Sequence, residues 1–277
     1  MAAEGIAPDC RSAIDLEAKA EAVALAKTKQ SAGCCFVLAV VAGMEIALGA
    51  TLMLVVKSDT SLSFAASQLL GGVGFSLGLL CVIVAGAELF TGNALMVCAT
   101  LSRKITWSAL VKNWAIVYAG NLVGSLAMVG LMTGAQIASM NGGALGAAIV
   151  SVASAKISLE WGTIFFRAIL CNVLVCLAVW MGFAGRTVID KVFTTIIPVM
   201  AFVACGFEHC IANMYFLPMG MATLAIGTCD GASAQVVNLA GAVWNISAAT
   251  LGNIVGGAVF VGLLYWLAYA KRDRTGK

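Results

Sequence analysis

Long apolar runs separated by short polar segments make up the chain from residue 33 to residue 270. A helix needs about 20 mainly apolar residues to cross the hydrocarbon core of a bilayer. Four runs have the length of one such helix: Gly33–Val56, Trp107–Ala135, Trp161–Ala184 and Val243–Ala270. We therefore expect each of these four runs to be a single transmembrane span.

Two further runs are too long for one straight span. Phe64–Leu101 and Val192–Cys229 each contain 38 residues, and the charged residue within them is Glu88 in the first and Glu208 in the second. A helix of that length would extend about 57 Å, nearly twice the hydrocarbon thickness of about 30 Å. The pattern indicates one span from each run, broken near its middle.

The two breaks share a motif. Gly86–Asn93 and Gly206–Asn213 both read G-x-E-x-x-x-x-N, 120 residues apart. A second match, in which Asn precedes Gly-Asn-x-Val-Gly by seven residues, links Asn113 with Gly120–Gly124 and Asn245 with Gly252–Gly256. Two matches in the same order indicate an internal duplication, and repeats of three spans must have opposite orientations. We predict an all-α membrane protein with six transmembrane helices, an inverted 3+3 repeat and two broken helices.

The polar ends of the chain predict its organisation. Residues 1–30 lack the apolar core of a signal peptide, and the segment Ser12–Lys29 is expected to be an amphipathic helix on the inner membrane face, capped by Ser12 or Asp9. Residues 31–270 are expected to form the pore domain, with repeats at about 31–135 and 161–270, and residues 271–277 a cytoplasmic tail.

Basic residues predict the orientation. Six spans place both termini on one side, together with the turns at 101–106 and 185–191. That side has twelve Lys and Arg residues, against two or three on the other side. By the positive-inside rule both termini are expected in the cytoplasm of a multi-pass inner (plasma) membrane protein.

Composition excludes several classes of protein. With 61% hydrophobic residues, 10% charged residues and a mean hydropathy of +1.00, the chain is neither a soluble globular protein nor a disordered one. A net charge of +3 gives no electrostatic basis for binding nucleic acid. Ten cysteines without metal spacing and a single histidine predict no metal, no cofactor and no enzyme.

The candidate pore chemistry lies at the breaks. His209, the only histidine, follows Glu208 in the second break, and Thr91 lies in the first break. An ionisable residue inside a membrane is a functional hypothesis, and histidine titrates near physiological pH, which suits proton exchange with a substrate. The alternative is a neutral histidine that hydrogen-bonds the backbone freed by the break.

The matched carboxylates and amides have a supporting role in this interpretation. Glu88 and Glu208 could form a proton pair, but we expect each carboxylate to satisfy loose backbone N–H groups at its break. Four matched asparagines are expected to hydrogen-bond between helices or loops: Asn93, Asn213, Asn121 and Asn253. Lys156, in the long outer connection, either draws anions in or is a solvated surface charge.

These motifs, over roughly residues 30–270, closely resemble the formate/nitrite transporter family. The resemblance rests on the stretches Ala87–Asn93, Lys112–Gly124, Leu170–Trp180, Gly206–Met214 and Gly252–Gly257. It implies an aquaporin-like six-span fold, assembled in the lipid bilayer as a homopentamer with one pore per protomer. It also implies a small monovalent anion as substrate, with formate first and nitrite or hydrosulfide as alternatives.

The resemblance also implies roles for single residues. His209 and Thr91 match the central pair of the pore, which could act as a proton relay. The other matches are Leu79 and Phe202 at the hydrophobic constrictions, Phe75 and Phe90 as their neighbours, and Lys156 and Asn172 in the outer vestibule. Residues 1–30 match loosely a segment proposed as a gate. Glu45 stands where related sequences more often have an apolar residue.

Three alternatives stay open or are disfavoured. Plain channel conduction, with His209 only polarising the site, is an alternative to proton-coupled transport. A neutral-solute channel of aquaporin type would share the architecture, but it is expected to have Asn-Pro-Ala at both breaks, and neither break contains it. A membrane redox subunit is disfavoured because one histidine cannot supply haem-ligating pairs.

Overall fold

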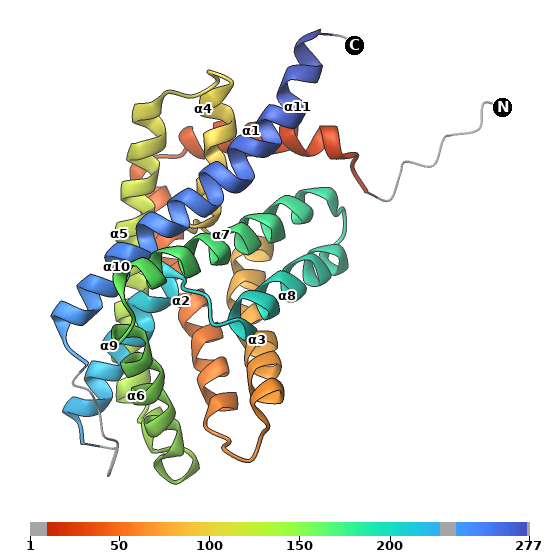
Figure 1. Ribbon diagram of the computed structural model, residues 1–277. Helices are drawn as coiled ribbons and strands as arrows, with labels where there is room; N and C mark the ends of the chain where they lie inside the picture. Colours follow the sequence, from red (N-terminus) through yellow and green to blue (C-terminus); the bar gives the residue numbers. More distant parts are fainter. Residues whose placement is uncertain (1–9, 228–236, 276–277) are drawn as a thin grey trace.

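The computed structural model describes residues 10–227 and 237–275, and the secondary structure within these ranges is helical throughout (Figure 1). The first half contains α1 (Ala13–Thr28), α2 (Ala32–Lys57), α3 (Phe64–Cys81), η1 (Val82–Gly86), η2 (Gly92–Met96), α4 (Val97–Leu101) and α5 (Trp107–Gly134). The second half contains η3 (Ile137–Ser139), η4 (Asn141–Gly143), α6 (Ala144–Ile157), α7 (Trp161–Ala184), α8 (Val188–Ala204), α9 (Cys210–Ala225), α10 (Leu239–Ile254), η5 (Val255–Leu263) and α11 (Leu264–Thr275).

Among the described residues, five helical segments are long and apolar enough to cross a membrane. They are Ala32–Lys57, Phe64–Gly86, Trp107–Gly134, Trp161–Ala184 and Leu239–Ala270. Four of them coincide with the runs predicted to be single spans. The long run Val192–Cys229, expected to form the fifth span, is divided between α8, with 17 residues, and α9, with 16 residues. The part of Val192–Cys229 beyond Gly227 lies outside the described residues.

The helices pack as two sets joined at α3 and α8. In the first set α2 packs against α3 and α5, and in the second set α7 packs against α8 and α10. α3 and α8 lie side by side, where the hydroxyl of Ser76 donates hydrogen bonds to the carbonyl oxygens of Gly72 and Ile196 (Figure 1). The two halves of the chain also meet where α5 packs against α9.

The helical structure is interrupted at residues 87–91 and 205–209, within the two runs predicted to be broken. A glycine has a left-handed conformation at each place: Gly86, the last residue of η1, has φ +90°, and Gly206, within the second interruption, has φ +67°. Glycine adopts this left-handed conformation at little steric cost, and it commonly ends helices. This conformation explains the glycine of the G-x-E-x-x-x-x-N motif.

The N-terminal helix α1 confirms the helix predicted between Ser12 and Lys29, with Ser12 as its cap. Its buried face, which includes Leu16 and Ala24, lies against α4, α7 and α11, and not only against a membrane surface. The carboxylate of Glu21 pairs with Lys104. Burial raises the pKa of Glu21, but hydrogen bonds from Lys104 and Ser102 outweigh burial and lower it.

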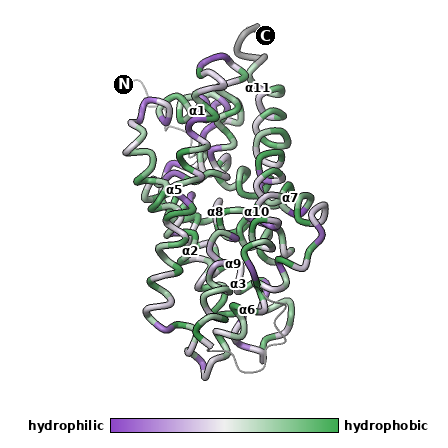
Figure 2. The backbone as a smooth tube through the Cα atoms, turned by 90° about the vertical axis from the view of Figure 1, so that its left-hand side faces the viewer, coloured by the Kyte–Doolittle hydropathy of each residue, from purple (hydrophilic) through white to green (hydrophobic). Residues whose placement is uncertain are grey.

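Hydropathy separates the two ends of the molecule. Figure 2 shows hydrophilic segments gathered around α1, whereas hydrophobic residues predominate along the helices away from that end. α1 also contacts α11, so the first and last described helices lie at the same end. This arrangement is compatible with an even number of membrane crossings between them.

Glycines allow close contact between long helices in both sets. A Cβ atom on Gly124 of α5 would collide with the carbonyl oxygen of Val40 in α2. Gly256, which follows α10, has the same relation to the carbonyl oxygen of Ile169 in α7. The glycines of the two matched Gly-Asn-x-Val-Gly motifs thus place backbone directly against backbone, as is common where helices associate in membranes.

We predict that Gly124→Ala lowers the thermal unfolding midpoint of the detergent-solubilised protein. Overpacking costs about 1–3 kcal/mol, which exceeds the gain in helix propensity of about 1 kcal/mol. Gly130→Ala in the same helix is the matched control, because no atom lies within 4 Å of its added Cβ. Equal midpoints for the two variants would show that the α2–α5 contact relaxes without cost.

Candidate functional site

The centre of the molecule brings together the two predicted central residues. The hydroxyl oxygen of Thr91 lies 3.1 Å from Nε2 of His209. Both side chains are buried, at 0% and 3% exposed. Thr91 precedes η2, and His209 precedes α9, so each residue lies where helix resumes after an interruption. The two interruptions therefore meet at one hydrogen bond.

His209 is also the N-cap of α9. Its Nδ1 accepts a hydrogen bond of 3.1 Å from the backbone N–H of Ala212. An accepting Nδ1 carries no proton, so Nε2 carries the proton of the neutral ring and donates to Thr91. A doubly protonated ring could not make the Ala212 bond. The neutral histidine therefore hydrogen-bonds backbone freed by the break, as the alternative hypothesis required. Its Nε2–H also remains a hydrogen-bond donor, which the pore hypothesis needs.

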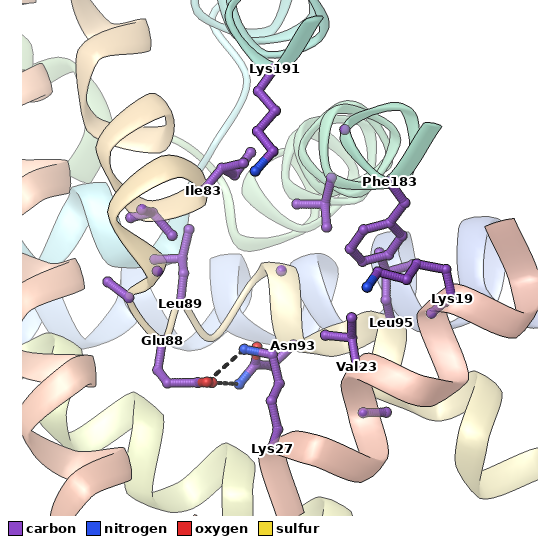
Figure 3. Close-up of a pocket in the computed structure, with 18 of the residues that line it drawn as sticks. Lys19, Val23, Lys27, Ile83, Glu88, Leu89, Asn93, Leu95, Phe183 and Lys191 are labelled. Carbon is purple, nitrogen blue, oxygen red and sulfur yellow. Dashed lines mark hydrogen bonds and ion pairs between the residues drawn. The ribbon is translucent and has the colours of Figure 1, made fainter. Parts of the chain in front are cut away.

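Each interruption is supported by a carboxylate and two asparagines. In the first, the side-chain amide of Asn93 donates to Glu88 at 2.7 Å and to Oδ1 of Asn113 at 2.9 Å. The other oxygen of Glu88 lies 2.7 Å from the ammonium nitrogen of Lys27 (Figure 3). The carboxylate therefore bonds side chains of α1 and η2, and the expected bonds from Glu88 to loose backbone N–H groups are absent from the described structure.

The second interruption has the same set of contacts. Asn213 donates to Glu208 at 2.7 Å and to Oδ1 of Asn245 at 2.6 Å. Lys156 of α6 lies 3.0 Å from the other oxygen of Glu208 and is only 14% exposed. Lys156 is therefore an ion-pair partner, and the interpretation of a solvated surface charge is wrong. Here too the carboxylate bonds side chains, contrary to our expectation.

Two further asparagines satisfy the interrupted backbone. Asn121 donates to the carbonyl oxygens of Ala39 and Glu88 and accepts from the N–H of Phe90. Asn253 donates to the carbonyl oxygens of Ala168 and Glu208 and accepts from the N–H of Cys210. Each amide thus fills two backbone hydrogen bonds at an interruption and ties it to a neighbouring helix, α2 for Asn121 and α7 for Asn253.

Two cavities approach the centre. One, here called the His209 cavity, has a volume of about 200 Å³ and is lined by His209, Phe202, Phe75, Phe216 and Lys156 among others. The other, here called the Glu88 cavity, has a volume of about 590 Å³ and is lined by Glu88, Lys27, Leu79 and Leu89 among others (Figure 3). His209 lines the first cavity, while Leu79 and Leu89 line the second.

Aromatic rings surround the His209 cavity. The rings of Phe75 and Phe202 meet edge to face at 5.6 Å, and Phe202 stacks on His209 at 6.0 Å between centroids. The ammonium nitrogen of Lys156 lies 5.5 Å from the ring centre of Phe216. The cavity thus offers a cation, then apolar rings, then the histidine.

Two predicted site residues, and one residue without a predicted role, line neither cavity. Asn172 is fully buried and donates to the carbonyl oxygens of Thr91, at 3.1 Å, and Asn253, so it lies behind the central pair and not in a vestibule. Phe90 packs against Trp114 and Tyr118 and lines neither cavity. Glu45 also lines neither cavity, and nothing in the structure explains it.

The sequence analysis missed Lys27 and Leu89. Lys27 precedes Lys156 by 129 residues, and Leu89 precedes His209 by 120 residues, so both are the partners of predicted residues in the duplicated pattern. Extending the repeat to include α1 and α6 would have identified the second lysine. In the described part of the chain, no group of three metal-binding side chains is arranged to hold a metal ion.

The fold and the site are those of a membrane channel or transporter. Comparison with known proteins shows to which family the chain belongs. A sequence model of the formate/nitrite transporter family matches residues 15–267. The chain belongs to the formate/nitrite transporter family, which is a family of transporters and not of enzymes. The interruptions, the two ion pairs and the central pair all lie within the matched residues.

Individual relatives are similar over most of their length. The chain is 38% identical to the formate channel FocA of Escherichia coli K12 over 248 residues, covering 86% of this chain and 87% of that one. It is 36% identical to the nitrite transporter NirC of the same strain, covering 84% and 82%. A solved pentameric formate channel with formate bound has a TM-score of 0.80 at 40% identity, covering 87% of this chain and 99% of that one.

We predict that Asn121→Ala and Asn253→Ala destabilise the protein by similar amounts. Each change leaves backbone groups unpaired, and an unsatisfied buried group costs about 1–3 kcal/mol. Both variants should therefore lose several degrees of thermal midpoint or fail to accumulate. Ser158→Ala is the control, because this exposed serine at the end of α6 bonds only the nearby carbonyl oxygen of Ala155. A stable, fully folded Asn253→Ala protein would contradict the proposed support of the interruption.

Proposed function

We propose that the protein is a channel for small monovalent anions of weak acids, with formate as the leading substrate and nitrite or hydrosulfide as alternatives. The observation that carries this proposal is the buried hydrogen bond between Thr91 and His209, at the meeting point of two helix interruptions. Membership of the family and similarity to a formate channel support the choice of anion.

The architecture that we propose is a six-span inverted repeat. α3 with α4 and α8 with α9 would each form one broken span, and the halves would be related by an axis in the membrane plane. The support for this is the matched set of contacts around Glu88 and Glu208. The two lysines extend the repeats to α1 and α6, beyond the boundaries expected at residues 31 and 161.

Assembly and orientation follow the same pattern. We propose a homopentamer in the inner membrane, in which each protomer has its own pore, because a solved relative is a pentameric channel. Both termini would be cytoplasmic, so that the Glu88 cavity opens to the cytoplasm and the His209 cavity to the outside. The basic-residue count supports this orientation.

The proposed path begins and ends at a lysine. Lys156 in the His209 cavity and Lys27 in the Glu88 cavity each present an ammonium group beside a carboxylate. The carboxylate keeps each lysine in place and lowers the net charge of the ion pair. The pair therefore attracts an anion without binding it too tightly to release it. α9 adds the partial positive charge of its N-terminus, which begins next to His209.

Two apolar constrictions flank the proposed centre. Phe202 with Phe75 would close the outer side, and Leu79 with Leu89 the inner side. An anion passing these side chains must shed water at a cost of many kcal/mol. The Nε2–H of His209 and the hydroxyl of Thr91 would then replace lost water as hydrogen-bond donors. Asn172 would hold Thr91 in place through its backbone carbonyl.

Proton coupling is the finer part of the proposal. Imidazolium at His209 would transfer its Nε2 proton to a formate oxygen, leaving neutral imidazole and formic acid, which crosses the inner constriction uncharged. To become imidazolium, the ring must bind a proton at Nδ1 and release the N–H of Ala212. Coupled transport therefore requires the first turn of α9 to open, whereas plain conduction by the neutral ring requires no change. The hydrogen bond at Nδ1 therefore supports a second candidate function, which is plain conduction without proton transfer.

We predict that Thr91→Val lowers formate flux about 10–100-fold in proteoliposomes. The change keeps the side-chain shape but removes a hydrogen bond to a charged group, which is worth about 1.5–3 kcal/mol. Thr91→Ser, which keeps the hydroxyl, should retain most of the flux. If the valine and serine variants conduct alike, the hydroxyl has no role in permeation.

We expect His209→Asn to remove the pH dependence of formate import between about pH 5 and 8, the range in which histidine titrates. Asparagine keeps a polar group but cannot exchange a proton. The measurement is initial formate flux at matched gradients across this range. Identical pH profiles for the parent and the variant would eliminate the relay and leave plain conduction.

The proposed orientation predicts the labelling of single cysteines in a cysteine-depleted variant. Thr60→Cys, in the exposed turn between α2 and α3, should react with an impermeant thiol reagent added outside intact cells. Arg103→Cys, in the exposed turn before α5, should react only after the membrane is opened. Reaction of both positions from the same side would contradict the six-span topology.

A further inference from the structure

The Glu88 cavity is larger than the proposed substrate requires. Its volume is about 590 Å³, within the range of about 300–1,000 Å³ typical of sites for drug-sized ligands. A formate or nitrite ion, with three heavy atoms, would occupy a small part of this space. The walls come from α1, from the end of the α3–η1 segment, from the first interruption and from the α7–α8 turn.

The charge of the cavity is one-sided. Its lining includes one carboxylate, Glu88, and five basic side chains: Arg11, Lys19, Lys27, Arg186 and Lys191. Lys27 pairs with Glu88, and the guanidinium of Arg11 donates to the carbonyl oxygen of Phe183. Neutralising Glu88 with Lys27 therefore leaves four cationic side chains around one space.

Four of these cations have no ion-pair partner within residues 10–227 and 237–275. Two of the four are Lys19, on α1, and Lys191, on α8. Their ammonium groups point into the cavity from different walls (Figure 3). The nearby carboxylate of Asp190 does not line the cavity. It accepts hydrogen bonds from the backbone N–H groups of Arg186 and Thr187.

The size and charge together indicate a ligand class. Several cations around one space repel one another unless an anion of comparable charge lies between them. Ammonium and guanidinium groups bind phosphate oxygens by charge-assisted hydrogen bonds. A multivalent anion with several phosphate groups matches both the charge and the volume better than any monovalent substrate.

We propose that the Glu88 cavity is a binding site for a soluble multivalent phosphate compound, such as an inorganic triphosphate or a nucleoside triphosphate, and that its occupation blocks the channel. Lys19 and Lys191 hold the phosphate chain between them. The bound anion lies over Leu79 and Leu89, and it cannot follow the path because shedding water from several charges is too costly. The binding claim is independent of the proposed function, while the block rests on it.

Binding is tested by calorimetry with inorganic triphosphate, without Mg²⁺, on the full-length protein in neutral detergent at low salt. The Lys19→Gln/Lys191→Gln variant should bind at least tenfold more weakly than the parent. Lys29→Gln is the matched control, because this exposed lysine ends α1 without lining the cavity. The control should bind within about twofold of the parent. No binding to the parent, or an equal loss in the control, would overturn the site.

Block is tested by formate flux in neutral phosphatidylcholine vesicles of known orientation. Triphosphate on the α1 side should reduce flux in the parent, and the double variant should need at least tenfold more for the same reduction. Triphosphate on the other side should have no effect. Equal block from both sides, or block undiminished in the double variant, would contradict a plug in this cavity.

Two further arms distinguish the sources of phosphate. Tighter binding of ATP than of triphosphate would assign a nucleotide, and equal binding an inorganic chain. Triphosphate binding that disappears when phosphatidylglycerol is added would show that a lipid headgroup takes the cavity, and would overturn the soluble ligand. A parent without formate flux would count against the proposed function, and calorimetry would still decide the site.

Discussion

Two non-helical segments lie among apolar helices, and their backbone groups need hydrogen-bond partners. The rest of the structure depends on this constraint. At residues 87–91 and 205–209 the chain gives up helical hydrogen bonds where little water can replace them. Asn121 and Asn253 supply the missing partners, and carboxylate–asparagine–lysine sets hold the following helices in place. A polar centre can exist there because the carboxylates, amides and lysines that support it bond to one another.

The proposed chemistry arises where the two halves stop matching. Most contacts around Glu88 have a counterpart around Glu208, including both lysines. The residue after the carboxylate differs, because it is Leu89 in one half and His209 in the other. The same backbone position thus presents an apolar side chain to one cavity and a hydrogen-bond donor to the other. The proposed path is therefore asymmetric, although the contacts that support it are matched in the two halves.

Several features were predictable because they depend on local pattern or on repetition. The positions of the interruptions and the α1 helix with its Ser12 cap followed from apolar runs and matched motifs, and the pairing of Thr91 with His209 followed from the family resemblance. The partners of Glu88 and Glu208 were not predicted correctly. Sequence separation hides which lysine reaches a buried carboxylate, so Lys27 was overlooked and Lys156 was assigned to an open vestibule.

The sequence by itself determined the class of protein, because apolar run length, low charge and duplicated motifs are properties of the chain alone. It also identified the histidine, because it is the only one in the chain, and the threonine, because it lies in the matching break. Only the tertiary structure decided that His209 caps α9, that Asn172 lies behind the central pair and that Phe90 lies away from both cavities. These facts depend on side-chain directions between distant helices, which packing sets and no local pattern encodes.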